Sequence, residues 1–134
     1  GAFRSDGSKP LVIAVTQLTS TSEERMNREL LIQATMEETV LHYAQNAKEA
    51  GLAGIVCSPL EAAIVKKGLG EDFITVTPGI RLPDSIKDDQ ARITTPVQAR
   101  EIGTDYIVVG RPIIRAENPV AAYDRFCHDF LGKA

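Results

Sequence analysis

The chain has 134 residues, 43% of them hydrophobic and 25% charged, which is the length and composition of one soluble globular domain. Its 15 Lys and Arg against 18 Asp and Glu give a net charge of −3, which excludes the basic surface typical of nucleic-acid-binding proteins. A phosphorylated substrate still fits this charge, because one phosphate needs only one or two well-placed cations.

Four short apolar runs predict the strands of the fold. They are continuously apolar rather than alternating, which is typical of strands buried on both faces of a parallel sheet. In chain order the runs are Leu11–Val15, Gly54–Cys57, Phe73–Val76 and Tyr106–Val109. We treat residues 11–134 as the folded unit and Gly1–Pro10 as a leader, or as the tail of a preceding connection.

Helical patterns with clear start signals lie between these runs. Ser58-Pro59-Leu60-Glu61 offers a capping serine, a first-turn proline and a capping-box glutamate, and Thr35 stands three residues before Glu38 in the same way. Thr95-Pro96 and Asn118-Pro119 repeat the cap-then-proline pattern. The predicted helices are Glu23–Ile32, Thr35–Ala50, Ala62–Lys67, Val97–Ile102 and Val120–Leu131. This alternation predicts an α/β fold with parallel neighbouring strands.

Two architectures share this pattern, an open doubly wound sheet and a segment of a (β/α)8 barrel. The sequence contains no GxGxxG after a strand and no GxxxxGK[ST], so both familiar nucleotide-binding loops of open sheets are missing. Four βα units are also only half of a barrel, whose usual length is ~250 residues. Periodicity alone does not separate the two architectures.

Polar residues gather where the predicted strands end, which is where ligands bind in both architectures. Thr16–Thr21 is a cluster of hydroxyl groups around one amide, Gly79 is followed by Arg81, and Gly110 is followed by Arg111. A glycine lets a ligand approach the backbone, and a guanidinium offers a planar fork to paired phosphate oxygens. Two such pairs at consecutive strand ends favour a phosphate monoester site over the simpler interpretation of solvated loop arginines.

At these residues the sequence resembles orotidine 5′-monophosphate decarboxylases of the bacterial type. The similar segments are colinear and cover almost the whole chain from Leu11 onward: Ile13–Thr21 (IAVTQLTST), Gly54–Ser58 (GIVCS), Val76–Arg81 (VTPGIR), Asp89-Gln90, Arg92–Pro96 (RITTP) and Tyr106–Pro112 (YIVVGRP). The resemblance implies a TIM-type (β/α)8 barrel that removes CO2 from orotidine 5′-monophosphate (OMP) to form UMP in pyrimidine biosynthesis, without a cofactor.

The resemblance also implies roles for five substrate-binding residues. Thr19 would contact the pyrimidine edge, and Gln90 would lie on a closing loop that bridges base and phosphate. Gly110 and Arg111 would hold the phosphate, with Arg81 assisting from the same side. These roles agree with the strand-end placement reached from the residues themselves.

The family's catalytic lysine and aspartates have no counterpart in the chain. Their hallmark D-x-K-x-x-D does not occur, and Asp84-Ser-Ile-Lys87-Asp88-Asp89 has the wrong spacing and is interpreted as a solvated charge run. We therefore expect strands five to eight of the barrel, no catalytic residue in this chain and no activity of the chain alone. Its expected partners are the missing half or a second copy, most simply as a homodimer, with no nucleic acid and no membrane.

Two other functions stay open at this point: a non-catalytic module that binds phosphate or nucleotide, and a sugar-phosphate decarboxylase or aldolase of the same barrel group.

His42 and His128 fall on predicted helices without a third ligand, so no metal site is expected. Cys57 lies within an apolar run and is expected to be buried, and Lys66-Lys67 is expected to be a solvated helix end. The two cysteines, Cys57 and Cys127, form no CxxC pattern, which favours a reducing, cytoplasmic compartment.

Overall fold

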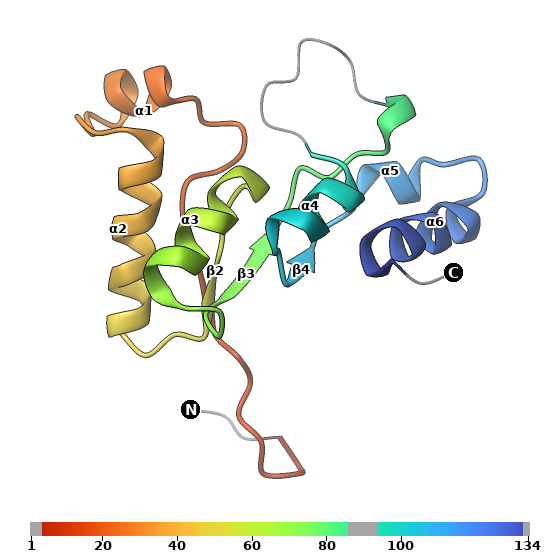
Figure 1. Cartoon of the computed structure of the whole chain (residues 1–134), viewed down its shortest axis with the longest axis horizontal. Coiled ribbons are helices and arrows are strands. Elements are labelled where there is room, and N and C mark those ends of the chain that lie inside the picture. The colour runs from red at the N-terminus through yellow and green to blue at the C-terminus, as the bar shows by residue number, and fades with distance from the viewer. Residues whose placement is uncertain (1–3, 86–93, 133–134) are drawn as a thin grey trace.

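Four parallel strands form one sheet in the computed structural model, which describes residues 4–85 and 94–132 (Figure 1). The strands lie side by side in the order in which they follow one another along the chain. Their bounds are β1 Ile13–Val15, β2 Gly54–Val56, β3 Ile74–Thr77 and β4 Tyr106–Ile107. All four predicted strands are therefore present, each shorter than its apolar run or displaced from it by one residue.

The helices connect the strands and pack in one row. They are α1 Glu23–Glu29, α2 Met36–Glu49, α3 Pro59–Leu69, α4 Pro96–Ile102, α5 Arg111–Ile114 and α6 Pro119–Leu131, with a 3-10 turn, η1, at Pro83–Ser85. Helix α3 packs between α2 and α4, and α4 also contacts α6. In a doubly wound sheet the strand order reverses and helices cover both faces, whereas here neither happens. The winding is that of a barrel, which answers the question that periodicity left open.

Capping side chains set the helix starts where the sequence predicts them. Thr35, Ser58 and Thr95 each accept a hydrogen bond from a backbone N–H in the first turn and complete a capping box with the residue three positions on. Asn118 accepts from the N–H of Ala121 at 3.1 Å. Each such cap is worth about 1 kcal/mol to its helix.

One helix prediction needs correction, and one short helix was not predicted. The first helix ends at Glu29 rather than Ile32, because Leu31 adopts a left-handed φ of 57° that no helix accommodates. The one-turn helix α5, which begins directly after Gly110, was not predicted, since four residues carry too little periodicity to detect.

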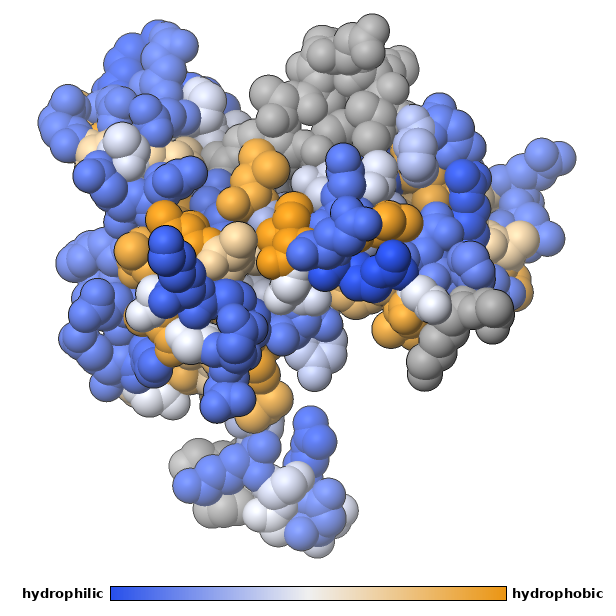
Figure 2. Space-filling view, viewed as in Figure 1, coloured by the Kyte–Doolittle hydropathy of each residue, from blue (hydrophilic) through white to orange (hydrophobic). Residues whose placement is uncertain are grey.

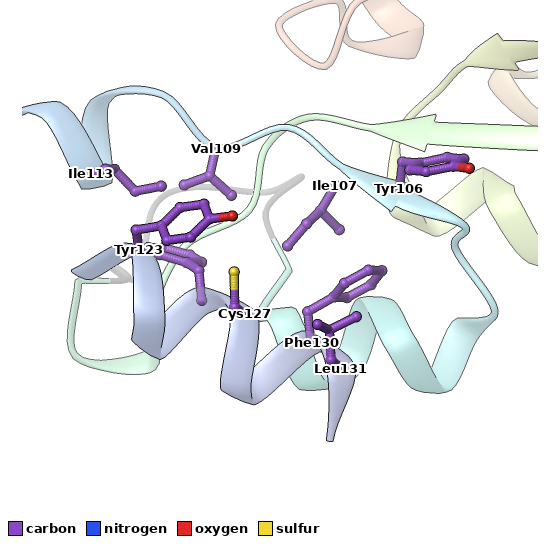
Figure 3. Close-up of a pocket in the computed structure, with 9 residues that line it drawn as sticks. Tyr106, Ile107, Val109, Ile113, Tyr123, Cys127, Phe130 and Leu131 are labelled. Carbon is purple, nitrogen blue, oxygen red and sulfur yellow. The ribbon is translucent and has the colours of Figure 1, made fainter. Parts of the chain in front are cut away.

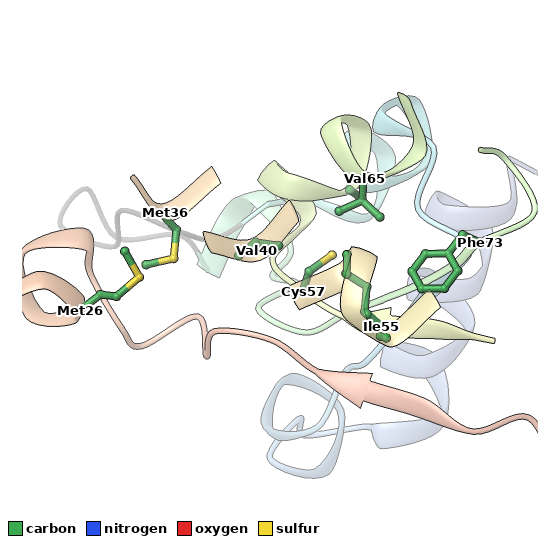
Figure 4. Close-up of a cluster of buried hydrophobic side chains, with 10 residues drawn as sticks. Met26, Met36, Val40, Ile55, Cys57, Val65 and Phe73 are labelled. Carbon is green, nitrogen blue, oxygen red and sulfur yellow. The ribbon is translucent and has the colours of Figure 1, made fainter. Parts of the chain in front are cut away.

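The main core lies between the sheet and helices α2 and α3. Figure 4 shows Ile55 of β2, and Cys57 directly after β2, beside Val40 of α2 and Val65 of α3. Ile55, Val40 and Val65 are completely buried, and Cys57 is buried as predicted. A smaller cluster of Ile80, Ala99 and Phe126 joins the segment after β3 to α4 and α6.

The prediction that the strands are buried on both faces is wrong. Val15 of β1 is 60% exposed and Tyr106 of β4 is 56% exposed, although both belong to apolar runs. The strand register places them in one row with Val56 and Val76, which are half-buried. Because successive side chains alternate between faces, this row lies opposite Ile55 and the helices. We call the face formed by these four residues the open face.

Lys66 is not a solvated helix end. Its side chain is 5% exposed, and its Nζ lies 2.6 Å from Oδ2 of Asp105, just before β4. Nζ also donates to the carbonyl of Glu71 at 2.6 Å. Asp105 Oδ2 accepts two further hydrogen bonds, from the backbone and hydroxyl of Thr75 on β3. The pair therefore ties α3, β3 and β4 together at the amino ends of the strands.

Close backbone contact makes one glycine of the sheet irreplaceable. A Cβ at Gly54 would lie 2.1 Å from the carbonyl oxygen of Ile74, its partner on β3. No side chain fits at that distance, so the β2–β3 pairing requires glycine at this position.

Candidate functional site

The two glycine–arginine segments follow neighbouring strands and leave the sheet at the same edge. β3 and β4 are paired in parallel, and beyond their last paired residues the N–H of Val108 donates to the carbonyl of Thr77 at 2.9 Å. Gly79 and Arg81 continue from β3, while Gly110 and Arg111 continue from β4. The structure therefore confirms that both segments stand at the carboxyl ends of adjacent strands, which is the ligand-binding edge of parallel α/β folds.

Gly110 presents an open stretch of backbone at this edge. It caps α5 with φ −110° and ψ −92°, and no atom lies within 4 Å of the point where a Cβ would stand. Its carbonyl accepts from the N–H groups of Ile113 and Ile114 at 2.9 and 3.1 Å. Among the described residues, none accepts a hydrogen bond from the Gly110 N–H, so this donor is available to a ligand.

The two arginines differ in how firmly they are held. Arg111 is exposed and forms no ion pair with the residues that the structure describes, which leaves its guanidinium free to meet an anion. Arg81 is half-buried, and its Nη1 donates to the neighbouring carbonyl of Ile80 at 2.8 Å. Its backbone N–H donates to the carbonyl of Thr94, and the Ile80–Thr94 bridge fixes this stretch against the segment that leads into α4.

Thr19 lies at the carboxyl end of β1, on the far side of β2 from the two arginines. It is half-buried in a turn closed by a hydrogen bond from the Thr21 N–H to the Leu18 carbonyl, at 2.9 Å. The neighbouring Gln17 is only 9% exposed, which makes it the most deeply buried residue of this polar cluster. Gln17 could not be singled out from the sequence, because nothing there separates it from the polar residues around it.

Gln90 lies outside the described residues, as do Lys87, Asp88 and Asp89 of the charge run. The described part of that run, Asp84, is exposed and forms an ion pair with Arg125 of α6 at 3.1 Å. The hydrogen bond from Arg125 lowers the pKa of Asp84. Asp84 thus belongs to the solvated surface, as predicted.

The apolar pocket between β4 and α6 has the wrong chemistry for a phosphate. Its volume is ≈ 270 Å³, and Figure 3 shows Tyr123, Cys127 and Phe130 of α6 facing Ile107 and Val109. A phosphate needs cations and N–H donors, and this lining offers neither. His42 and His128 are both exposed, and the described residues hold no group of three or more His, Cys, Asp or Glu side chains placed to bind a metal ion.

No helix within residues 4–85 and 94–132 is long and apolar enough to cross a lipid bilayer. Figure 2 shows mostly hydrophilic side chains around α2, with apolar patches where α3 and α4 meet. This view shows no broad apolar belt around the helices.

Parallel βα units wound in one direction, with their helices in a single row, define this chain as a segment of a (β/α) barrel. The model of the orotidine 5′-phosphate decarboxylase / HUMPS family matches residues 2–126. The chain belongs to this family.

Two relatives and one solved structure show how much of the family's length is present. The orotidine 5′-phosphate decarboxylase of Geobacillus sp. (strain WCH70) is 55% identical over 125 residues, which are 93% of this chain and 52% of that protein. That of Staphylococcus saprophyticus is 58% identical over 121 residues, 90% of this chain and 53% of that protein. The crystal structure of the Lactobacillus acidophilus enzyme superposes with a TM-score of 0.78 at 41% identity, covering 95% of this chain and 52% of that one.

The chain therefore spans about half the length of the curated relatives it matches. The superposition and the strand order confirm that its four strands form half of a (β/α)8 barrel. The five predicted substrate-binding residues fall into two groups: four lie at described strand ends, and Gln90 is in the part that is not described.

Proposed function

We propose that this chain is the nucleotide-binding half of an orotidine 5′-phosphate decarboxylase, a carboxy-lyase that converts OMP to UMP and CO2. One observation carries the proposal: adjacent strands β3 and β4 each deliver a glycine followed by an arginine to the same edge of the sheet. Family membership then selects a nucleotide monophosphate from the many phosphate esters that such a site would accept.

In this proposal the phosphate is held at the end of β4. The Gly110 N–H and the Arg111 guanidinium donate to its oxygens, because both donors are free of other described partners and the backbone around Gly110 is open. Arg81 adds a second positive charge from β3. Thr19 contacts the pyrimidine from the opposite side of the half-barrel, and Gln90 bridges base and phosphate.

The chemistry itself requires residues that this chain lacks. In the reaction the bond between C6 and the carboxylate carbon breaks, CO2 leaves, and the electron pair that remains on C6 takes a proton. By resemblance to the family, a lysine supplies that proton and an aspartate crowds the departing carboxylate. Neither has a counterpart among the 134 residues, so we expect the chain alone to bind nucleotide without decarboxylating OMP.

The division of roles has a physical logic. Contacts to the phosphate lie far from the reacting carbon, and such remote binding energy accelerates a reaction only when it helps to assemble the reactive site. A half-chain can therefore keep the phosphate contacts and lose the rate enhancement. A cytoplasmic location stays a prediction that accompanies this function.

Calorimetric titration of the chain with UMP, which measures the dissociation constant, tests the proposal. Arg111→Ala removes a charge-assisted hydrogen bond worth about 1.5–3 kcal/mol, so it should weaken binding roughly 10- to 100-fold. Arg115→Ala is the matched control, because Arg115 is an exposed arginine at the other end of α5. Equal affinity of the two variants would refute the assignment of Arg111.

An activity assay separates the enzyme half from a non-catalytic binding module. Mixing the chain with the complementary half of a relative should restore formation of UMP from OMP if the chain is the binding half of the enzyme. Tight UMP binding without activity in that mixture would favour the binding module. Preference for a sugar phosphate over UMP in the mixture would favour a different enzyme of the barrel group.

A further inference from the structure

Gln17, just beyond the carboxyl end of β1, has a buried side-chain amide that is not used by the fold. The residue is only 9% exposed, and its amide forms no hydrogen bond with any of the residues that the structure describes. Most buried polar groups in proteins are hydrogen-bonded, because a group that leaves water without gaining a new partner destabilises the folded state. An exception next to a candidate ligand site therefore calls for a functional explanation.

Other buried polar side chains of this chain do have partners. The hydroxyl of Thr75 bonds to the carboxylate of Asp105, and Ser58 caps α3. Among the described residues, Thr104 Oγ1 is the only completely buried side-chain polar atom that lacks a partner. The Gln17 amide also lacks one, so its oxygen and nitrogen are not completely buried and both keep contact with solvent. The amide is therefore shielded from bulk water and still within reach of a ligand.

The backbone on both sides of Gln17 is held in place. Thr16 bonds to the carbonyl of Val56 on β2 through its backbone N–H at 3.1 Å and through its hydroxyl at 2.8 Å. On the other side, the turn from Leu18 to Thr21 is closed by a hydrogen bond of 2.9 Å between their backbone groups. Gln17 thus stands between two fixed points, which is the arrangement that positions a binding side chain before its ligand arrives.

The chemistry around Gln17 favours a neutral ligand group. The cluster Thr16–Thr21 contains no charged residue, so it offers no counter-ion to a phosphate or to a cation. A primary amide donates through its NH2 group and accepts through its oxygen. Its best complement is a neutral edge that carries a donor and an acceptor side by side. The imide edge of a uracil or orotate ring, in which N3–H lies between two carbonyl groups, is such an edge.

The distance between the two ends of the site agrees with a nucleotide. Neighbouring strands lie about 4.8 Å apart, so β1 is separated from β3 by about 10 Å and from β4 by at most about 14 Å. A free phosphate held at Gly110 and Arg111 does not extend that far across the sheet. A nucleotide monophosphate carries its base on the far side of the sugar, and the curvature of a closed barrel shortens the distance that it has to bridge.

We propose that Gln17 is a specificity-determining residue that recognises the imide edge of the pyrimidine beside Thr19. Its carbonyl oxygen accepts from N3–H, and its NH2 group donates to an adjacent ring carbonyl. This inference rests on the proposed function, because it takes the ligand of the strand ends to be a pyrimidine nucleotide. A ligand without an imide leaves the amide unpaired, and a site with an unpaired buried polar group discriminates against such a ligand.

The stability of the chain provides the first test. Gln17→Leu replaces an amide that the fold does not use with an apolar group of similar size, so the midpoint of urea denaturation should stay the same or rise. Gln17→Met, which keeps the unbranched shape, covers the case in which leucine does not fit. Gln45→Leu is the matched control, because Gln45 is exposed on α2 and donates only to the nearby Glu49 at 3.3 Å. A midpoint that falls for both Gln17 variants and not for the control would show that the fold needs the amide, and would overturn the proposal.

Ligand binding provides the second test. The complementary half of a relative is fused ahead of this chain in one polypeptide, and calorimetry compares UMP, ribose 5-phosphate and 3-methyl-UMP, in which a methyl group replaces the N3 hydrogen. Gln17→Leu should weaken UMP binding roughly 10- to 100-fold, as expected for the loss of two neutral hydrogen bonds, and leave ribose 5-phosphate binding unchanged. The unsubstituted fusion should bind UMP more tightly than 3-methyl-UMP, whereas the Gln17→Leu fusion should bind both alike.

The same titrations separate this inference from the proposed function. If the unsubstituted fusion binds UMP and Gln17→Leu binds it equally well, Gln17 does not recognise the base and the proposed function still stands. Equal losses for UMP and ribose 5-phosphate would assign Gln17 to the fold and would also overturn the inference. A fusion that binds no UMP would refute the proposed function itself, and the inference with it.

Discussion

The ion pair between Lys66 and Asp105 allows a sharp test of how this half-barrel is held together. Nζ of Lys66 lies 2.6 Å from Oδ2 of Asp105, and the two side chains are 5% and 32% exposed. Asp105→Asn keeps the shape of the side chain and its capacity to accept from Thr75 while removing the negative charge. The variant leaves the Lys66 ammonium buried with neutral acceptors alone, among them the carbonyl of Glu71.

The expected cost follows from this difference in burial. Removing one partner of a fully buried ion pair costs about 3–5 kcal/mol, because the remaining charge is uncompensated. Asp105 is about a third exposed, so solvent screens the pair and a cost below that range, ~2–3 kcal/mol, is expected for Asp105→Asn. Lys66→Met leaves the more exposed partner behind and should cost less, about 1–2 kcal/mol. The double variant should cost less than the sum of the two single variants.

The pH dependence provides a second signature. Burial of Asp105 opposes ionisation, but the hydrogen bonds from Lys66 and Thr75 and the charge of Lys66 outweigh it, so the pKa of Asp105 is lowered. A lowered folded-state pKa stabilises the fold above the unfolded value of about 3.9, and this contribution is lost as the pH falls through the folded-state pKa. The stability difference between wild type and Asp105→Asn should therefore be full near neutral pH and shrink below about pH 4.

Urea denaturation followed by circular dichroism measures these differences. Asp84→Asn is the matched control, since it breaks an exposed ion pair with Arg125 at 3.1 Å, which solvent screens, and it should cost much less than Asp105→Asn. If Asp105→Asn proves no more destabilising than Asp84→Asn, the reasoning from burial is wrong. The same conclusion follows if the difference persists unchanged at low pH.

Three further predictions concern the sheet and the ligand. Gly54→Ala should destabilise the chain by ~3 kcal/mol or more in urea denaturation, because its Cβ would lie 2.1 Å from the Ile74 carbonyl, whereas Gly51→Ala, strained only by a φ of 79°, should cost about 1 kcal/mol. Ile55→Ala should cost about 2–5 kcal/mol in the same assay, because Ile55 is completely buried, and a loss below 1 kcal/mol would contradict the assigned core. Calorimetry should show that the monomeric form of the chain binds UMP and ribose 5-phosphate with similar affinity. A strong preference for UMP would show that the base contacts form before the barrel is closed.

The features predicted correctly from sequence are those decided by neighbouring residues. Thr35, Ser58 and Thr95 cap their helices as expected, because a capping side chain needs only the backbone of its own first turn. Strand order could be predicted only through the resemblance to the family and not from periodicity, because pairing joins residues far apart in the chain. The open face of the sheet was missed for a related reason. An apolar run indicates which residues avoid water in the completed fold, but it does not indicate which face of the sheet the helices cover.

Lys66 shows where a local interpretation fails. Two consecutive lysines near a helix end suggest solvent, and Lys67 is indeed exposed. The sequence did contain a signal for the correct answer, since Lys66 lies four residues after the buried Ala62 and three before Leu69, on the core stripe of α3. Its partner Asp105 stands 39 positions further along the chain and becomes a neighbour only through the β3–β4 pairing.

The expected lack of selectivity between UMP and ribose 5-phosphate follows from where the ligand contacts are anchored. The phosphate contacts depend on β3 and β4, whose pairing is secured within this chain by the Lys66–Asp105 pair at one end and the Ile80–Thr94 bridge at the other. Thr19 follows β1, which is separated from β3 by β2, so its distance from the phosphate depends on the curvature of the whole sheet. A sheet with one face uncovered has nothing to hold that curvature at the value a closed barrel requires. Phosphate affinity should therefore be a property of the half-barrel itself, and base selectivity should appear only when a second set of strands closes the ring.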